Sequence, residues 1–189
     1  VYAQGFQVKP LVIEVPVPAG QVSETALDLS NISTEPVTLV VRAIDLTQGR
    51  DGNWQLIEPD SGVDTSNLLS ALPWIALQTN LVELEPATTA RVGIRFSVPS
   101  SARGTYVAGI IAEQPQVNQV GLTVRVRFLI PVIITIAGRP VRQQVELSSV
   151  DLLKKDAELA SDRSTLTMVG IANRGRTYSR IGGEVRVDV

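Results

Sequence analysis

Apolar and polar residues alternate along much of the chain, most clearly between Val120 and Phe128. A period of two is typical of a strand with one buried face. The sequence then becomes apolar at almost every position from 129 to 137, which predicts that this part of the strand is buried on both faces. We therefore expect one long strand over 120–137 around which the rest of the fold is organised. The apolar residues of its alternating half are Val120, Leu122, Val124, Val126 and Phe128.

Shorter runs of the same kind predict further strands. The prolines within 6–18 lack a backbone donor and favour the edge of a sheet, whereas the Val-rich run 36–45 favours a central strand. The region 54–72 is the least periodic, with a short helical turn expected at 66–72. The expected strands lie at 6–18, 21–31, 36–45, 72–77, 81–84, 88–98 and 106–113.

Several short strands separated by turns, without an amphipathic helix, predict an all-β fold and an immunoglobulin-like β-sandwich. Gly104-Thr105-Tyr106 supports this prediction, because it is similar to the tyrosine corner of immunoglobulin folds. The turn at 138–140 is the expected domain boundary. It divides a sandwich of residues 1–138 from a partial second β domain of residues 139–189.

The second domain is expected to contain a strand at 141–150, a polar segment with a helical turn at 151–162, and a hairpin formed by 165–173 and 178–187. Its sequence around Asn173 is similar to that around Asn31, since both Asn residues end an apolar strand and begin a turn. Only residues 174–189 follow Asn173, too few to complete a sandwich. Either the chain is a fragment of a longer protein, which we favour, or another chain supplies the missing strands.

Composition narrows the possible chemistry. Hydrophobic residues make up 44% of the chain but aromatic residues only 4%, and the chain has no His or Cys. Imidazole bases, thiolate nucleophiles and zinc sites built from His or Cys are therefore excluded. We expect no enzymatic activity, no cofactor and no metal site. The acidic residues Asp45, Asp51, Asp60 and Asp64 do not form a calcium-loop motif and are expected in turns.

Charge and the N-terminal residues bear on partners and location. Residues 1–118 hold 6 basic and 12 acidic side chains and residues 119–189 hold 11 and 7, so the two parts carry −6 and +4. This asymmetry is too weak to predict nucleic-acid binding. The start Val1-Tyr2-Ala3-Gln4 is similar to the end of a signal peptide, which favours export, unless it is an arbitrary starting point. No apolar run is long enough to predict a membrane span.

The order of these motifs resembles a known family. Residues 5–137 are similar to the N-terminal domain of periplasmic pilus-assembly chaperones, and also to extracellular immunoglobulin-like domains of Gram-positive surface proteins that interact with WxL proteins. The motifs that carry this resemblance are L-D-L-S-N-I-S-T-E-P-V, W-I-A-L, L-E-P-A-T-T-A-R-V-G-I-R-F-S-V-P and G-T-Y-V-A-G-I.

The chaperone resemblance implies donor-strand complementation, in which the last strand of the domain fills the groove of a subunit. The row Val120, Leu122, Val124, Val126 and Phe128 would then bind the partner, a pilin-like or surface-protein subunit. The resemblance also implies a basic anchor for the partner's terminal carboxylate. The matching residues are Lys9 from the first strand and Arg125 or Arg127 from the last.

Two alternatives remain. The alternating row can be core, covered by the chain's own second sheet. The surface-protein resemblance implies a structural or adhesive module that binds a cell-wall polymer or a partner surface protein, with Trp54 as the exposed aromatic and Trp74 in the core. The sequence thus predicts a non-catalytic binding protein, periplasmic or at the cell surface, that acts in the assembly of surface structures through strand addition.

Overall fold

The computed structural model describes residues 5–49, 52–65, 67–115, 126–138, 141–154 and 165–177. The chain divides into two units, Val1–Pro140 and Val141–Val189. Each unit is described by itself.

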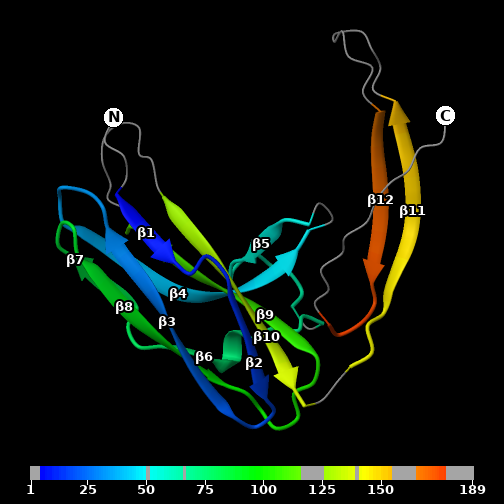
Figure 1. Ribbon diagram of the computed structural model, residues 1–189, viewed down its shortest axis with the longest axis horizontal. Helices are drawn as coiled ribbons and strands as arrows, with labels where there is room; N and C mark the ends of the chain where they lie inside the picture. Colours follow the sequence, from blue (N-terminus) through cyan, green and yellow to red (C-terminus); the bar gives the residue numbers. More distant parts are fainter. Residues whose placement is uncertain are drawn as a thin grey trace. The chain divides into compact units, whose positions relative to one another are not determined.

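The first unit is an immunoglobulin-like β-sandwich, which confirms the predicted fold class (Figure 1). One sheet has four strands in the order β1-β3-β8-β6, and the other has six, in the order β2-β10-β9-β4-β5 with β7 also paired to β4. The strands are β1 (Phe6–Lys9), β2 (Ile13–Pro18), β3 (Val22–Asn31), β4 (Val37–Gln48), β5 (Trp54–Ile57), β6 (Ile75–Leu77), β7 (Leu81–Leu84), β8 (Thr89–Ser97), β9 (Thr105–Glu113) and β10 (Arg127–Ala137).

The first two strands lie at sheet edges, as the prolines of 6–18 predict. Strand β1 pairs antiparallel with β3 in one sheet, and β2 pairs parallel with β10 in the other. The chain therefore changes sheets between Lys9 and Ile13. Pro16 and Pro18 lie in β2, where the missing backbone donors leave the central ladders intact.

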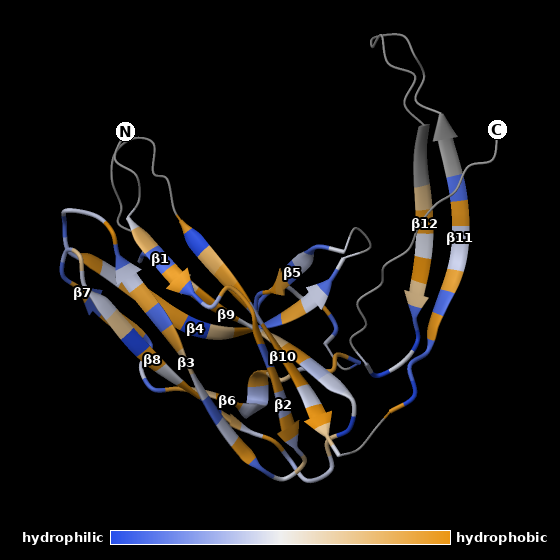
Figure 2. Ribbon diagram, in the orientation of Figure 1, coloured by the Kyte–Doolittle hydropathy of each residue, from blue (hydrophilic) through white to orange (hydrophobic). Residues whose placement is uncertain are grey.

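The core lies between the two sheets and is almost entirely aliphatic. On β3 and β8 the inward residues Leu27, Leu29, Ile94 and Phe96 are at most 1% exposed. Strands β4, β9 and β10 contribute the facing layer, and Figure 2 shows β9 and β10 as hydrophobic over most of their length. The strands expected at 21–31 and 88–98 are thus present, with the alternating apolar residues of each facing the core.

The segment 72–77 differs from its prediction as one strand. Leu72–Trp74 forms a 3-10 turn, and only Ile75–Leu77 is a strand, paired with β8. Pro73 explains the difference, because its fixed φ suits the first turn of a helix and its missing donor does not suit a ladder. The helical turn expected at 66–72 is not present in residues 67–71, where the described structure has only a hydrogen-bonded turn from Thr65 to Leu68, and Ser66 lies outside the described residues.

The second unit contains a two-stranded antiparallel sheet, β11 (Val145–Lys154) and β12 (Thr165–Asn173). The helical turn expected at 151–162 is wrong for residues 151–154, which continue β11. The strand expected at 165–173 is present, but its described partner is β11. The expected partner 178–187 lies outside the described residues.

The two Asn turns have the same geometry. Asn31 pairs with Phe6 at the end of β3, and Asn173 pairs with Val145 at the end of β12. In each turn the Asn amide nitrogen donates to the carbonyl four residues on, at 2.8 Å for Asn31 and 2.7 Å for Asn173. The side-chain oxygen accepts the N–H two residues on, at 2.8 and 3.0 Å. The similarity noted in the sequence is therefore a structural repeat.

Candidate functional site

Strand β10 offers two different edges along its length. Along one edge it pairs antiparallel with β9 from Arg127 to Thr135. Along the other edge it pairs with β2, but only from Val132 to Ala137. Among the described residues, no strand covers this second edge between Arg127 and Pro131. Open backbone donors and acceptors at an edge are a template for another strand.

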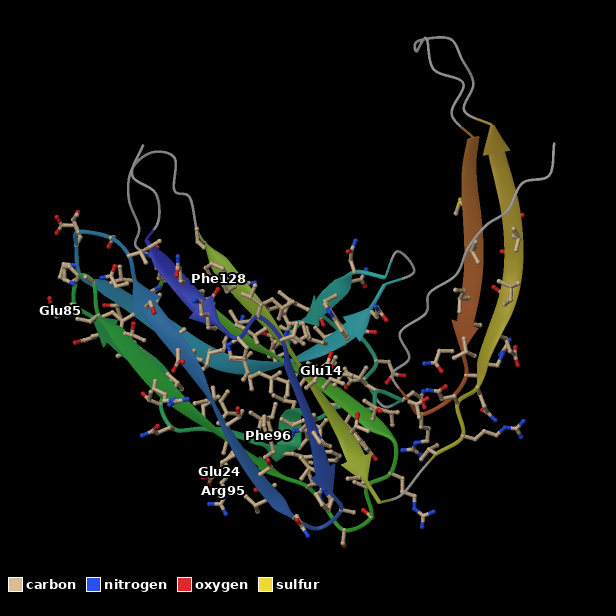
Figure 3. All side chains as sticks on the ribbon, in the orientation of Figure 1. Glu14, Glu24, Glu85, Arg95, Phe96 and Phe128 are labelled. Atoms are coloured by element: carbon tan, nitrogen blue, oxygen red, sulfur yellow. The ribbon has the colours of Figure 1, made fainter. Side chains whose placement is uncertain are left out.

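The two described members of the alternating row lie at this open part of β10. Val126 and Phe128 are half-buried and pack against the main core. The Phe128 ring meets the Phe6 ring edge-on, with 5.0 Å between centroids. Figure 3 shows Phe128 near β1, at some distance from Phe96 along the sandwich. Val120, Leu122 and Val124 lie outside the described residues.

The outer face of the six-stranded sheet carries a second, smaller apolar cluster. Its centre is formed by Ile44, Leu46 and Ile111, all at most 2% exposed. Leu129 packs against them from β10, and a Cβ added to Gly109 would lie 2.9 Å from the Leu129 side chain. The glycine therefore lets Leu129 close over β9. This cluster agrees with the prediction that the strand is buried on both faces beyond Phe128.

Four charged residues border this cluster at the start of β10. Glu113 is 4% exposed at the end of β9, and its carboxylate lies 2.6 Å from Arg127 Nε and 3.5 Å from Arg42 Nε. Glu58 approaches the same two guanidinium groups from the surface, at 3.1 Å from Arg42 and 3.5 Å from Arg127. We call these four residues the β10 charge cluster. This cluster was not predicted from the sequence. The only signal for it there is Glu113, the acidic residue that ends the apolar run 106–113.

The candidate anchor residues lie in different environments. Lys9 is exposed at the end of β1, opposite Asp28 in the register. Arg127 belongs to the β10 charge cluster, so its guanidinium already has two carboxylate partners. Arg125 lies outside the described residues.

Neither tryptophan forms an isolated aromatic platform. Trp54 is half-buried and packs against the outer cluster, which differs from the exposed position expected for it. Trp74 packs against the main core and lies 4.2 Å from the Tyr106 ring, as expected for a core residue. Tyr106 follows Gly104, whose φ of 86° favours glycine, at the start of β9.

Within the described ranges, no group of three or more acidic residues is placed to hold a metal ion. The same residues contain no helix long and apolar enough to cross a membrane. Of the acidic residues expected in turns, Asp45 lies in β4, where its carboxylate accepts a hydrogen bond from the Ser70 hydroxyl.

Solved structures with a similar fold include several fimbrial chaperones. The chaperone–tip adhesion subunit pre-assembly complex CsuC–CsuE of Acinetobacter baumannii Csu pili contains a chain with a TM-score of 0.53 and 12% identity, over 90% of this chain and 77% of that one. The class 5 fimbriae chaperone CfaA gives 0.52 and 10%, over 90% and 67%. A chain of the chaperone–tip adhesin complex of CFA/I fimbriae gives 0.51 and 9%, over 91% and 67%.

These identities show the fold alone, a chaperone-like immunoglobulin fold. No protein-family model matches the sequence, and no curated protein matches it.

Proposed function

We propose that this chain is a non-catalytic, chaperone-like protein that binds a partner by strand addition at the open edge of β10. The proposed partner is a pilin-like or surface-protein subunit, bound during the assembly of a surface structure. The proposed location is outside the cytoplasm, in the periplasm or at the cell surface. The observation that carries the proposal is the edge of β10, closed by β2 from Val132 onward and open over Arg127–Pro131 among the described residues.

The side chains at this edge suit an apolar strand. Val126 and Phe128 are half-buried on the inner face, and Leu129 is half-buried on the outer face. An added strand would bury the remaining apolar area of all three, and burial of apolar surface contributes about 25 cal/mol per Å². Backbone hydrogen bonds to β10 would supply register and affinity, as in other cases of β-augmentation. In the sequence, Val120, Leu122 and Val124 extend the same alternation.

A terminal carboxylate of the partner would require a cation near this edge. We propose Lys9 for this role, because it is exposed at the end of β1. Arg127 is a weaker candidate, since a second carboxylate would compete with Glu113 and Glu58 for its guanidinium. Arg125 remains a candidate from the sequence.

The fold comparisons support the class of function. Two of the similar structures contain a chaperone together with a tip subunit or tip adhesin. The rival proposal, a structural or adhesive module that binds a cell-wall polymer, has less support, because Trp74 packs against the main core and Trp54 is half-buried against the outer cluster.

A photo-cross-linking experiment tests strand addition. Benzoylphenylalanine replaces Phe128 at the open edge of β10 in one variant. In the matched control it replaces Leu81, which is 51% exposed on β7. Both variants are expressed in the native cells and irradiated, and the products are mapped by mass spectrometry.

We expect one predominant cross-linked protein at position 128 that is absent at position 81, with the cross-link inside a strand-forming segment of the partner. Equal products from both positions, or none from position 128, would contradict the proposal. A different result would favour the structural module: both variants sediment equally with purified cell wall, and no cross-linked protein forms at position 128.

A further inference from the structure

The β10 charge cluster occupies the rung that begins the described ladder of β9 and β10. Glu113 and Arg127 are direct cross-strand partners, and Arg42 lies on β4, the strand on the other side of β9. The two carboxylate oxygens of Glu113 are shared between the neighbouring strands, with Oε2 at Arg127 and Oε1 at Arg42. One buried carboxylate thus connects three strands at the point where the open edge of β10 begins.

The register of β10 decides which of its side chains face the core. Side chains alternate along a strand, so a slip by one residue would exchange its two faces. The slip would move Arg127 to the apolar inner face and Phe128 to the outer face. Apolar contacts alone resist it weakly here, because residues 128–134 are apolar on both faces. The slip would also leave the buried carboxylate of Glu113 without Arg127, and an unpaired buried charge is strongly unfavourable.

We propose that Glu113 is the residue that sets the register of the proposed strand-addition edge. Its carboxylate, held between Arg42 and Arg127, keeps Val126 and Phe128 on the inner face. It therefore also determines which faces β10 presents to a partner strand over Val126–Pro131. This last step rests on the proposed function; the register itself does not.

Disulfide trapping measures the register directly, because the chain has no Cys of its own. The native-register pair is Ile111→Cys with Leu129→Cys, which are direct partners. The shifted pair is Ile111→Cys with Phe128→Cys, whose side chains lie on opposite faces in the native register. Partners on antiparallel strands have Cα atoms about 4.5–5.5 Å apart, within the range that disulfides span.

Each pair is placed in three backgrounds: unchanged, Arg42→Leu/Glu113→Leu/Arg127→Leu, and Glu58→Gln. The triple change removes the buried carboxylate of Glu113 together with its two partly exposed arginine partners, and proteins often tolerate the joint removal of an ion pair without losing stability. The Glu58→Gln change is the matched control, since Glu58 contacts the same two arginines from the surface. The readout is the fraction of each disulfide after oxidation, by mass spectrometry.

We expect the unchanged and Glu58→Gln backgrounds to form the native-register disulfide almost alone. In the triple variant we expect the shifted disulfide to increase about tenfold, a change typical of the coupling between contacting residues. An unchanged ratio in the triple variant would overturn the proposal. If the triple variant unfolds, the ratio of shifted to native-register disulfide is measured in Glu113→Gln instead, and an unchanged ratio there would likewise overturn the proposal. These measurements use the free chain and need no partner. A negative result here would overturn the register proposal alone, whereas a negative cross-linking result at position 128 would contradict the proposed function.

Discussion

The antiparallel strand pairs β1–β3 and β11–β12 are built alike but are buried very differently. In both pairs the second strand ends in an Asn turn with the same hydrogen bonds. In both, the backbone N–H of the residue after the Asn also donates to the carbonyl of the residue before the first strand. The Ile32 N–H donates to Gly5 at 2.6 Å, and the Arg174 N–H donates to Gln144 at 2.8 Å. Yet Leu29 is 0% exposed, whereas Ile171, at the equivalent rung, is 41% exposed.

This comparison separates two causes of structure. Strand alternation and the hydrogen bonds within an Asn turn are local, and both features recur in the two units. Burial is not local, because it depends on a second sheet that covers the apolar face. In the first unit β4, β9 and β10 provide that sheet. The same substitution should therefore have a large effect on stability in β1–β3 and a small effect in β11–β12.

The largest contrast is expected for the paired substitutions Leu29→Ala and Ile171→Ala. Leu29→Ala removes a fully buried side chain, which typically lowers the free energy of unfolding by about 2–5 kcal/mol. Ile171→Ala removes a side chain that is already partly in water, so its loss should be below about 1 kcal/mol. Urea denaturation, followed by residue-resolved hydrogen exchange in each strand pair, measures both values. Equal losses would show that the apolar face of β12 is covered as fully as that of β3.

A smaller contrast is expected between Asn31→Ala and Asn173→Ala. Asn31 is 1% exposed, and its amide also donates to the Leu84 carbonyl at 3.0 Å, which ties β3 to β7. Its removal leaves buried backbone groups unpaired, at a cost of about 1–3 kcal/mol. Asn173 is exposed, so water can replace the hydrogen bonds of its side chain. Asn173→Ala should therefore lower the free energy of unfolding by only about 0.5 kcal/mol. Thermal unfolding of the two variants tests this order, and the reverse order would contradict it.

A third prediction concerns the glycine that each Asn turn requires. A Cβ on Gly5 would lie 2.6 Å from the Ser33 nitrogen, whereas in the second unit position 144 is Gln and the residue two after the Asn is Gly175. Gly5→Ala should therefore destabilise the first unit by roughly 1–2 kcal/mol through overpacking. Adding Ser33→Gly, which copies the second unit, should recover part of this loss. A double-mutant cycle measures the coupling, and strict additivity would argue against the equivalence of the two turns.

The smallest effect is expected for Glu146→Gln. The Glu146 carboxylate pairs with Arg174 at 2.9 Å, with both side chains at least 60% exposed. Exposed pairs contribute about 0–1 kcal/mol and are screened by salt. In high salt, the free energy of unfolding of the variant, measured by urea denaturation, should therefore equal that of the unchanged chain. A loss that persists at high salt would mean that this pair is buried in solution.

Much of the sandwich follows from its sequence because its signals are local. The alternation of 21–31 and 88–98 predicted β3 and β8 with their inward faces, and the prolines of 6–18 predicted edge strands. The 3-10 turn at Leu72 was missed because W-I-A-L resembles a strand until the conformation of Pro73 is considered. The continuation of β11 through Lys154 was missed because D-L-L-K is polar enough for a helical turn, and its pairing with β12 is not visible in a single segment.

The candidate site was harder to predict, because it depends on pairing between distant residues. The sequence identified the apolar strand, but not that β2 covers only the part from Val132 onward. It also treated Arg127 as a free cation, since the contacts to Glu113 and Glu58 join residues 14 and 69 positions apart. Whether the row from Val120 to Phe128 binds a partner stays a prediction.

Hydrogen exchange along β10, in the free chain and in the complex isolated through position 128, tests strand addition most directly. Strand addition predicts that binding increases the protection of the amides of Val126–Ile130, while those of Val132–Ala137 change little because β2 already covers that edge. Added protection confined to another edge strand, such as β6 or β7, or unchanged protection of the Val126–Ile130 amides, would contradict strand addition at β10.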